Sequence, residues 1–297
     1  MPPSTRPSSW RSSPKRRRDK RTSAFLDHRT GAFLTVSEAI AASGIDAREA
    51  RLLLAEVCGF SQASLAASPE QEIPFDVENS FIEFIQRRIK GEPVAYILGR
   101  SEFYGLELSV NPAVLIPRSE TELLVDLALE KDPASVLDLG TGSGAIALAI
   151  KRHLPESKVV AVDSSMAALV VARRNATKLN LEIDFRHGRW FDPVAGERFE
   201  LIVSNPPYVA NGDPHLAGLR FEPQGALLAG PEGLDSIREI VKAAGSFLLP
   251  GGGLLLEHGI GQDAAVRDLL AAAGLESVAT WPDLAGIARV SGGELKS

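Results

Sequence analysis

Apolar residues between positions 31 and 100 recur every three or four residues, which is the period of an α-helix. Ser37 and Asp46 stand just before such runs, where they are expected to cap helix N-termini. Gly59 follows the second run, and a glycine at that place commonly ends a helix. The apolar positions expected on helix faces are Ala50, Leu53, Leu54 and Val57, followed by Phe81, Phe84, Ile85 and Ile89. Residues 31–100 are therefore predicted to form a small helical domain.

The pattern changes twice after this segment. Within residues 101–116, aromatic and β-branched residues flank Gly105, which predicts a hairpin that links two domains. Within residues 117–297, short apolar runs alternate with longer helical patterns, which indicates an α/β domain with a parallel sheet. Strands are expected at 135–139, 158–163, 183–187, 199–204, 252–257, 276–281 and 286–292, and helices at 119–131, 144–153, 165–179, 234–248 and 262–273. A ligand crevice is expected outside the carboxyl ends of these strands.

The overall composition is that of a globular protein. The 297 residues are 44% hydrophobic and 24% charged, which is enough for one large domain or two modest ones. No run of about eighteen uncharged apolar residues occurs, so a membrane-spanning helix is not expected. Cys58 is the single cysteine, so an intrachain disulfide and a cysteine metal cage are excluded and no metal site is expected. A reducing compartment, the cytoplasm, fits this cysteine usage.

Charge is distributed unevenly along the chain. Residues 1–30 carry nine Lys and Arg against two Asp, a balance of +7 in a chain whose formal net charge is −6. The remainder of the chain is therefore strongly acidic, which disfavours a nucleic-acid substrate. Residues 1–30 are rich in Ser, Pro and Arg and lack any apolar period, so they are interpreted as a basic disordered tail. A nucleic-acid-binding arm and an organellar transit peptide are the alternatives for this tail.

A glycine-rich segment follows the first strand of the α/β domain. This glycine loop, residues 140–144, comes directly after Asp138 and Leu139 and opens a helix. Its alternate glycines allow a sharp turn and a close approach of the backbone to a ligand. Asp163 ends the next strand, where a carboxylate can accept hydrogen bonds from both ribose hydroxyls. The pattern indicates a nucleoside pocket: S-adenosylmethionine is favoured, and a nicotinamide or flavin site or a plain tight turn are the alternatives.

A second loop follows the strand FELIVS at residues 199–204. It consists of Asn205, Pro206, Pro207 and Tyr208, and we call it the diproline corner. Two prolines remove two backbone donors and fix the chain direction, which leaves carbonyl oxygens for other partners. The Asn205 side-chain oxygen and the Pro206 carbonyl can each accept one hydrogen bond from a planar –NH2 group on which Tyr208 can stack. This arrangement suits transfer of a methyl group from a sulfonium donor to an amide or amino nitrogen, although a stiffened turn alone is possible.

Taken together, the motifs resemble those of the glutamine-N5 methyltransferases that modify peptide chain release factors. The resemblance covers nearly everything from Thr35 to the C-terminus. Besides DLGTGSG and NPPY, the segments that carry it are RRIKGEPVAYILG, EFYGL, LIPRSETE, DPHL, RFEP and LLLEHG. It implies a class I methyltransferase fold, Rossmann-like with a seven-stranded sheet, behind an N-terminal helical domain that recognises the protein partner. It also implies S-adenosylmethionine as methyl donor and class 1 release factors as partners, with the Gly-Gly-Gln glutamine as acceptor.

The resemblance assigns roles to individual residues. For the donor, it implies contacts with Gly140, Thr141, Gly142, Ser143, Gly144, Asp163, Trp190 and Asn205. For the glutamine, it implies contacts with Arg118, Glu120, Thr121 and Glu122 and with the catalytic residues Asn205, Pro206, Pro207 and Tyr208. No residue of the diproline corner is an obvious proton acceptor, and that role is left unassigned. His258 and Cys58 are expected to be structural.

Two positions depart from the pattern of that family. Ser119 stands where the family usually has a proline, which frees one φ angle. Gly188 and Arg189 stand before Trp190, where an acidic residue usually accepts from the adenine amino group. A guanidinium only donates hydrogen bonds, so Arg189 cannot replace that contact. A backbone carbonyl is expected to substitute, or donor binding to be weaker; stacking of the adenine on Arg189 is the less favoured alternative.

Two other functions are compatible with parts of the pattern. The NPPY tetrapeptide is shared with adenine-N6 methyltransferases that act on nucleic acid, although the helical front segment and IPRSETE are not. A nucleoside-binding regulatory protein without turnover is the third interpretation, and the presence of Asn205, Tyr208 and Asp163 argues against it.

Overall fold

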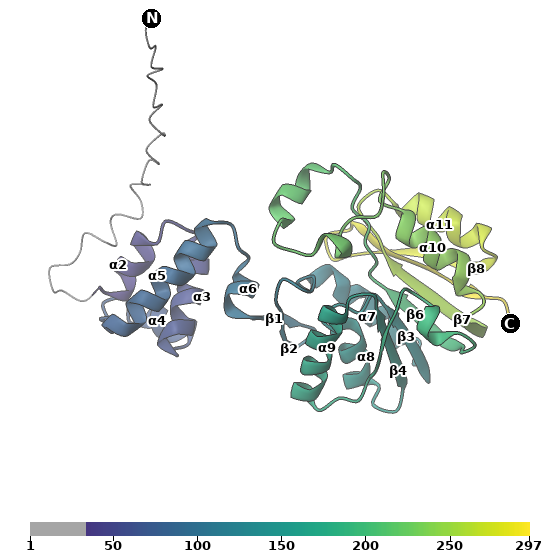
Figure 1. Ribbon diagram of the computed structural model, residues 1–297, viewed down its shortest axis with the longest axis horizontal. Helices are drawn as coiled ribbons and strands as arrows, with labels where there is room; N and C mark the ends of the chain where they lie inside the picture. Colours follow the sequence, from purple (N-terminus) through teal and green to yellow (C-terminus); the bar gives the residue numbers. More distant parts are fainter. Residues whose placement is uncertain (1–33) are drawn as a thin grey trace, which may run out of the picture. The chain divides into compact units, whose positions relative to one another are not determined.

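The computed structural model describes residues 34–297 (Figure 1). The chain divides into two compact units, one ending at Lys90 and the other spanning Gly91–Ser297. The basic tail expected at residues 1–30 lies outside the described residues.

The N-terminal unit contains four helices, counted within the described residues, as the sequence pattern predicts. They are α2 (Val36–Ala42), α3 (Ala47–Cys58), α4 (Gln62–Ala67) and α5 (Phe75–Ile89). Leu53, Leu54 and Phe81 are fully buried in this unit, because helical spacing places them on inward faces. Ile89, expected on the same face as Phe81, is 49% exposed instead, since it closes the last turn of α5.

Two of the three helix signals in this unit are confirmed. The Asp46 carboxylate accepts from the backbone N–H groups of the first turn of α3, and Gly59 ends that helix at φ 66°. The prediction for Ser37 is wrong, because Ser37 lies inside α2. Thr35 is the cap: its hydroxyl accepts from the Glu38 N–H, and the Glu38 carboxylate accepts from the Thr35 N–H.

The C-terminal unit begins earlier than the domain boundary expected after residue 100. Its first elements are α6 (Val94–Leu98) and the antiparallel hairpin of β1 (Arg100–Phe103) and β2 (Leu106–Ser109). Tyr96 on α6 is buried and donates its hydroxyl to the Val114 carbonyl at 2.5 Å. The hairpin also packs into this unit rather than standing as a separate linker, because its apolar residues join the unit's core.

A seven-stranded sheet forms the centre of the C-terminal unit, as predicted. Its strands are β3 (Ser135–Leu139), β4 (Lys158–Asp163), β5 (Asp184–His187), β6 (Phe199–Ser204), β7 (Leu248–Glu257), β8 (Leu275–Pro282) and β9 (Ala288–Leu295). Their order across the sheet is β5-β4-β3-β6-β7-β9-β8. The expectation of a parallel sheet is confirmed for β3 to β7 and is wrong at β9, which is antiparallel to β7 and β8. The turn after β8, closed by the Asp283 N–H to Ile287 carbonyl bond, is too short for a parallel crossover.

Helices cover both faces of this sheet (Figure 1). They are α7 (Glu122–Glu130), which follows a 3-10 turn at Ser119–Thr121, then α8 (Ala145–His153), α9 (Met166–Leu179), α10 (Asp235–Ala244) and α11 (Asp263–Ala272). The five helical regions predicted from the sequence are thus confirmed, with ends displaced by a few residues. Within residues 34–297, no helix is both long enough and apolar enough to span a bilayer.

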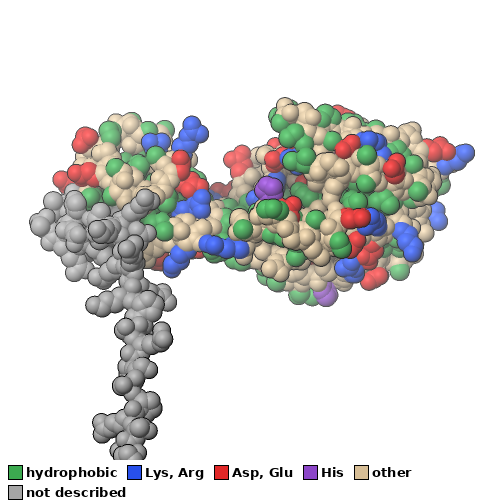
Figure 2. Space-filling model, turned by 90° about the horizontal axis from the view of Figure 1, so that it is seen from above, with side chains coloured by type: hydrophobic (Ala, Val, Ile, Leu, Met, Phe, Trp, Pro, Cys, Tyr) green, Lys and Arg blue, Asp and Glu red, His purple; other side chains and the backbone are tan. Residues whose placement is uncertain are grey.

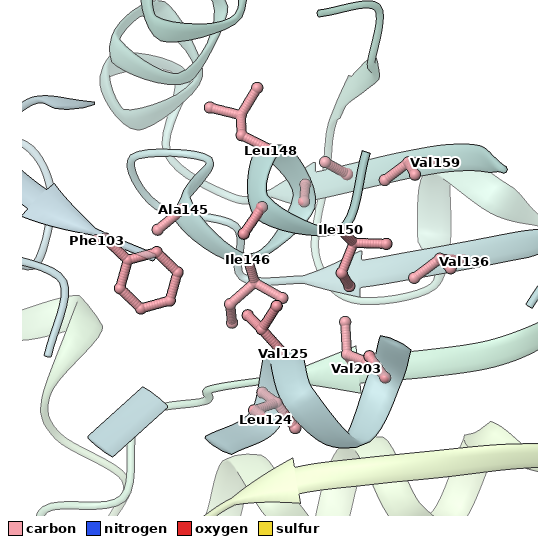
Figure 3. Close-up of a cluster of buried hydrophobic side chains, with 14 of the residues drawn as sticks. Phe103, Leu124, Val125, Val136, Ala145, Ile146, Leu148, Ile150, Val159 and Val203 are labelled. Carbon is pink, nitrogen blue, oxygen red and sulfur yellow. The ribbon is translucent and has the colours of Figure 1, made fainter. Parts of the chain in front are cut away.

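Two apolar cores lie on opposite faces of the sheet. Val136 belongs to the core that includes α7 and α8, whereas the next residue, Leu137, belongs to the core that includes α10 and α11. This alternation follows from the two-residue period of a strand. Figure 3 shows the first core, where Leu124 and Val125 of α7 face Ile146 of α8. The two cores hold the sheet rigid between its helical layers, so the loops at its edges start from fixed positions.

Three strand ends at the centre of the sheet bring the sequence motifs together. Leu139 at the end of β3 pairs with Val162 of β4 on one side and with Ser204 of β6 on the other. All three strands are parallel, so the glycine loop, Asp163 and the diproline corner leave the same edge.

Charged side chains of both signs are mixed on the surface. On the face of the C-terminal unit seen in Figure 2, acidic and basic groups lie interspersed among apolar and neutral ones. A continuous basic stripe, the usual footprint of a nucleic-acid site, is not seen on that face.

Candidate active site

The glycine loop turns back over the end of β4. Gly140, Gly142 and Gly144 have φ values of 74°, 57° and 84°, a region that side-chain-bearing residues rarely adopt. The N–H groups of Gly140 and Thr141 both donate to the Val162 carbonyl, at 2.8 and 3.0 Å. The alternating glycines predicted to allow a sharp turn therefore do so.

The other residues of the glycine loop face the protein interior. The Thr141 hydroxyl donates to Asp138 Oδ2 at 2.7 Å, and the Ser143 carbonyl accepts from Asn175 Nδ2 at 2.9 Å. A Cβ atom on Gly144 would lie 3.1 Å from Leu148 Cδ1 and 3.3 Å from the Ala172 Cβ atom. The absence of a Cβ atom on Gly144 thus leaves room for α8 to pack closely against α9.

Asp138 is a buried carboxyl group beneath the glycine loop. Burial raises its pKa to about 7, against the effect of the hydrogen bond from Thr141. Its Oδ1 atom has no hydrogen-bond partner within the described residues. Asp138 therefore holds the loop through Thr141 and keeps one acceptor position unused.

Asp163 joins the glycine loop to the start of α9. Its two carboxylate oxygens accept from the N–H groups of Gly142 and Ser165, each at 2.8 Å. Burial raises its pKa, while these two hydrogen bonds oppose the shift. A carboxylate has about four lone-pair positions, so Asp163 can still accept from two hydroxyl groups.

The loops border a cavity of about 610 Å³. Its lining includes Gly140, Gly142, Asp163, Asn205 and Pro207. This volume lies within the range of small-molecule and cofactor sites. The cavity thus joins the predicted nucleoside pocket to the diproline corner.

The diproline corner is held by hydrogen bonds from both of its polar side chains. Asn205 Nδ2 donates to Thr121 Oγ1 at 3.1 Å, and the Tyr208 hydroxyl donates to Glu257 Oε1 at 3.1 Å. Pro206 is buried and Pro207 half-buried, so the chain between the two polar residues is packed in place. The Asn205 Oδ1 atom remains available as an acceptor.

Tight packing fixes the Tyr208 backbone and ring. A Cβ atom on Gly233 would lie 2.3 Å from the Tyr208 carbonyl oxygen, and one on Gly259 would lie 3.3 Å from the ring atom Cδ2. The Tyr208 carbonyl also accepts from Gln262 Nε2 at 3.1 Å. Burial and the neighbouring Glu257 raise the pKa of Tyr208, so its hydroxyl stays protonated.

Comparison with known proteins identifies the two units. Residues 33–99, which include the described part of the N-terminal unit and the start of the C-terminal unit, match the PrmC N-terminal domain, and residues 119–220 match the methyltransferase small domain. The chain is 48% identical over 276 residues to the release factor glutamine methyltransferase of Burkholderia pseudomallei. The aligned region covers 88% of this chain and 96% of the relative. It is 46% identical to the enzyme of that name from Neisseria gonorrhoeae, over 88% of this chain and 98% of the relative. The chain belongs to the release factor glutamine methyltransferase family.

Solved structures agree with the fold. A methyltransferase from Pyrococcus furiosus superposes with a TM-score of 0.53 at 18% identity, over 71% of this chain and 98% of that one. With the family match, this confirms the predicted class I S-adenosylmethionine-dependent methyltransferase fold.

The residues around the cavity fit the S-adenosylmethionine that a family of methyltransferases implies. The positive-φ glycines Gly140 and Gly142 offer backbone without Cβ atoms, and Asp163 offers acceptors for the ribose hydroxyls. Trp190, also in the lining, provides an aromatic surface beside Gly140. Thr141, Ser143 and Gly144 are absent from the lining, so side-chain contact with the donor is not seen for them. No group of three or more metal-binding side chains occurs among residues 34–297.

The residues before α7 that the resemblance assigns to the family's active site have different surroundings. Thr121 is buried and contacts Asn205 of the diproline corner. Arg118 pairs with the buried Glu222 at 2.5 Å, and Glu120 is half-buried. The remaining residue, Glu122, accepts from the Tyr104 N–H in the β1–β2 turn at 2.7 Å. The structure therefore brings Thr121 to the diproline corner and gives Arg118 and Glu122 partners elsewhere.

The departure at Arg189 has a clear structural setting. Arg189 forms an ion pair with Glu239 of α10, in which Arg189 Nε donates to Glu239 Oε1 at 2.9 Å. The Arg189 guanidinium also lies 5.4 Å from the centre of the Trp190 ring. The Arg189 charge is thus already paired. The Trp190 Nε1 atom is buried without a partner among the described residues.

Glu257 is the main residue that sequence reasoning missed. It ends β7, next to β6 in the sheet, is only 1% exposed and accepts from Tyr208. The available signal was its position: like Asp163, it is a carboxylate at the carboxyl end of a strand. His258, interpreted as structural, is buried and its Nε2 atom lies 2.9 Å from Ser291 Oγ.

Proposed function

We propose that the protein transfers a methyl group from S-adenosylmethionine to the side-chain nitrogen, N5, of a glutamine in class 1 peptide chain release factors. The acceptor is the glutamine of their Gly-Gly-Gln motif, and the methylation modulates translation termination. The observation that carries the proposal is the shared cavity: Asp163 and the glycine loop line it together with Asn205 and Pro207. Family membership supplies the reaction class.

The donor is placed by the glycine loop and its neighbours. S-adenosylmethionine is the methyl donor, and when bound it supplies a methyl group on a positively charged sulfur that leaves readily. Asp163 would hold the ribose hydroxyls, Gly140 and Gly142 would lie along the methionine part, and Trp190 would pack by the adenine.

The diproline corner places the acceptor. The Asn205 Oδ1 atom and the Pro206 carbonyl would accept the two N–H groups of the glutamine amide, with the Tyr208 ring against its flat face. Because an amide nitrogen is a poor nucleophile, these oxygens also stabilise the positive charge that develops on it. Holding nitrogen and methyl carbon at near-attack distance can contribute roughly 7–11 kcal/mol at best.

The N-terminal unit is the proposed recognition element for the release factor. It is a separate compact unit, and its sequence lies within the match to the PrmC N-terminal domain. We also propose the cytoplasm as the location, because the substrate acts in translation and the lone Cys58 suits a reducing compartment.

The test is mass spectrometry of a release factor incubated with S-adenosylmethionine and the full chain. We expect one methyl group on the Gly-Gly-Gln glutamine, and none on a release factor in which that glutamine is replaced by glutamate. Double-stranded DNA is offered in a parallel reaction. A release factor that stays unmodified overturns the substrate assignment; methylated adenine in the DNA would then establish the nucleic-acid alternative, and donor binding without transfer to either would establish the regulatory one.

A further inference from the structure

Glu222 is a buried acid in the long connection between the diproline corner and α10. It belongs to the RFEP segment, to which the proposed chemistry gives no role. Its side chain is only 3% exposed. The connection, residues 209–234, contains 3-10 turns but no α-helix, and all of it lies in the described part of the chain. Connections longer than about 15 residues without regular structure are uncommon and usually serve a function.

Both carboxylate oxygens of Glu222 bind one other segment of the C-terminal unit. Oε1 accepts from Arg118 Nη2 at 2.5 Å, and Oε2 accepts from the Ile116 N–H at 3.2 Å. This segment has no regular structure between β2 and the 3-10 turn, and Pro117 within it has no N–H. A buried carboxylate is stable only when it is paired and hydrogen-bonded, so Glu222 and the segment hold each other in place.

The segment leads directly to the residue that holds Asn205. The Thr121 N–H donates to the Arg118 carbonyl at 3.2 Å, which closes the 3-10 turn. At the end of this turn, the Thr121 hydroxyl accepts from Asn205 Nδ2 at 3.1 Å. A short path of side-chain and backbone contacts therefore joins Glu222 to the amide of the diproline corner.

We infer that Glu222 is a positioning residue for Asn205. It fixes the segment that ends in the 3-10 turn, and the turn sets where Thr121 holds the Asn205 side chain. The inference rests on the proposed function, because Asn205 Oδ1 is the oxygen that would accept from the glutamine amide. A displacement of about 1 Å in such a group can lower turnover about 100-fold. Glu222 does not line the cavity, so its effect is indirect.

The part of the segment that faces the donor has separate supports. Val114, four residues before Arg118, lines the cavity. Its carbonyl accepts from the Tyr96 hydroxyl at 2.5 Å, and its side chain packs in a core that includes Ala168 of α9. Loss of the Glu222 contacts should therefore displace the 3-10 turn more than the cavity wall. Turnover and donor binding should respond differently.

The experiment measures release factor methylation and calorimetric binding of S-adenosylhomocysteine for Glu222→Gln. Glutamine has nearly the same shape but one acceptor oxygen, so either Arg118 or the Ile116 N–H loses its partner. We expect kcat to fall about 10- to 100-fold. The Kd for S-adenosylhomocysteine should stay within about twofold, because the cavity wall keeps its own supports.

A milder variant keeps the test independent of how well Glu222→Gln folds. Glu222→Asp retains the charge and both acceptor oxygens on a side chain that is one methylene shorter. It should lower kcat about three- to tenfold, because the segment must shift to reach the carboxylate. Its Kd for S-adenosylhomocysteine should also remain that of the wild type. Denaturant unfolding of both variants establishes that the measured protein is folded.

A double substitution separates positioning from a general loss of stability. Thr121→Val removes the hydroxyl that holds Asn205 but keeps the side-chain shape, and should itself lower kcat about 10-fold or more. If Glu222 acts through Thr121, adding Glu222→Gln to Thr121→Val should lower kcat by less than about threefold further, because the contact is already lost. Independent effects would multiply, to a combined loss of about 100-fold or more.

The matched control is Tyr96→Phe. It removes a hydrogen bond from the same buried cluster as Ile116 but lies outside the path to Asn205, so kcat at saturating donor should stay within about threefold. Unchanged kcat in both Glu222 variants, a rise in Kd as large as the fall in kcat, or multiplied effects in the double variant would each overturn the inference. A wild type that leaves the release factor unmethylated overturns the proposed function instead.

Discussion

The two halves of the cavity are built in different ways. The half that we propose holds the donor, called the donor half, consists mainly of backbone groups from residues 138–165. These residues are close in the sequence and are joined by hydrogen bonds to the Asp138 and Asp163 side chains. The half that we propose holds the glutamine, called the acceptor half, is the diproline corner, which side chains from distant segments hold in place. Asn205 forms a hydrogen bond with a residue 84 positions away, and Tyr208 with one 49 positions away. Where backbone groups form a binding site, binding depends on the backbone conformations that the residues can adopt. Where side chains form it, binding depends on individual functional groups. Substitutions should therefore separate donor binding from turnover.

The largest expected effect comes from the acceptor half. Asn205→Ala removes the oxygen that we propose stabilises the developing charge, so kcat should fall by about 100-fold or more. Affinity for S-adenosylhomocysteine should change far less, because the glycine loop and Asp163 are intact. Release factor methylation, followed by mass spectrometry, measures the first quantity and calorimetry the second. Asn211→Ala, in an exposed loop, is the matched control and should behave as the wild type. Equal losses in affinity and turnover would contradict the division into two halves.

The next effect concerns the donor half. Asp163→Asn puts an –NH2 group where a carboxylate oxygen now accepts from Gly142 or Ser165. Losing hydrogen bonds to a charged acceptor costs about 1.5–3 kcal/mol, so the Kd for S-adenosylhomocysteine should rise about 10- to 100-fold. At saturating donor, kcat should fall much less than in Asn205→Ala. An unaltered Kd in calorimetry would show that Asp163 does not hold the donor.

The donor half could largely be predicted from the sequence because its contacts are local. The glycine loop, the strand that ends in Asp163 and the helix after it follow one another, and their spacing alone indicates the turn. The seven strands were also predictable, since each is a short apolar run between turn signals. The antiparallel direction of β9 was not, because it depends on a short turn rather than on the strand pattern.

The acceptor half was only partly predictable. The diproline corner can be recognised from its residue types. Nothing near it in the sequence, however, indicates that Thr121 and Glu257 are its hydrogen-bond partners. Their meeting depends on the order of β6 and β7 in the sheet and on the 3-10 turn before α7. Such contacts between distant segments arise from tertiary packing, which periodicity along one chain does not encode.

A smaller effect, on stability, tests whether Gly144 belongs to the donor contacts or to the packing. Gly144→Ala adds a Cβ atom 3.1 Å from Leu148 Cδ1 at a residue with φ 84°. Positive φ and overpacking together should lower the free energy of unfolding by about 1–3 kcal/mol. Gly218→Ala, where a Cβ atom meets no heavy atom within 4 Å, is the control for denaturant unfolding. A stable Gly144→Ala protein with weak donor binding would assign Gly144 to the donor contacts after all.

The smallest expected effect concerns Arg189, the clearest departure from the family pattern in the donor half. Its guanidinium already pairs with Glu239, and the two side chains are 58% and 46% exposed. An exposed pair of this kind contributes up to about 1 kcal/mol, so Arg189→Ala should change the Kd for S-adenosylhomocysteine by less than about fivefold. Glu239→Ala should match it in calorimetry, because each substitution removes the same ion pair. If the Kd rose tenfold or more in Arg189→Ala but not in Glu239→Ala, the guanidinium would instead contact the adenine directly. Because a guanidinium cannot accept a hydrogen bond, that contact would be stacking of the adenine on its flat face.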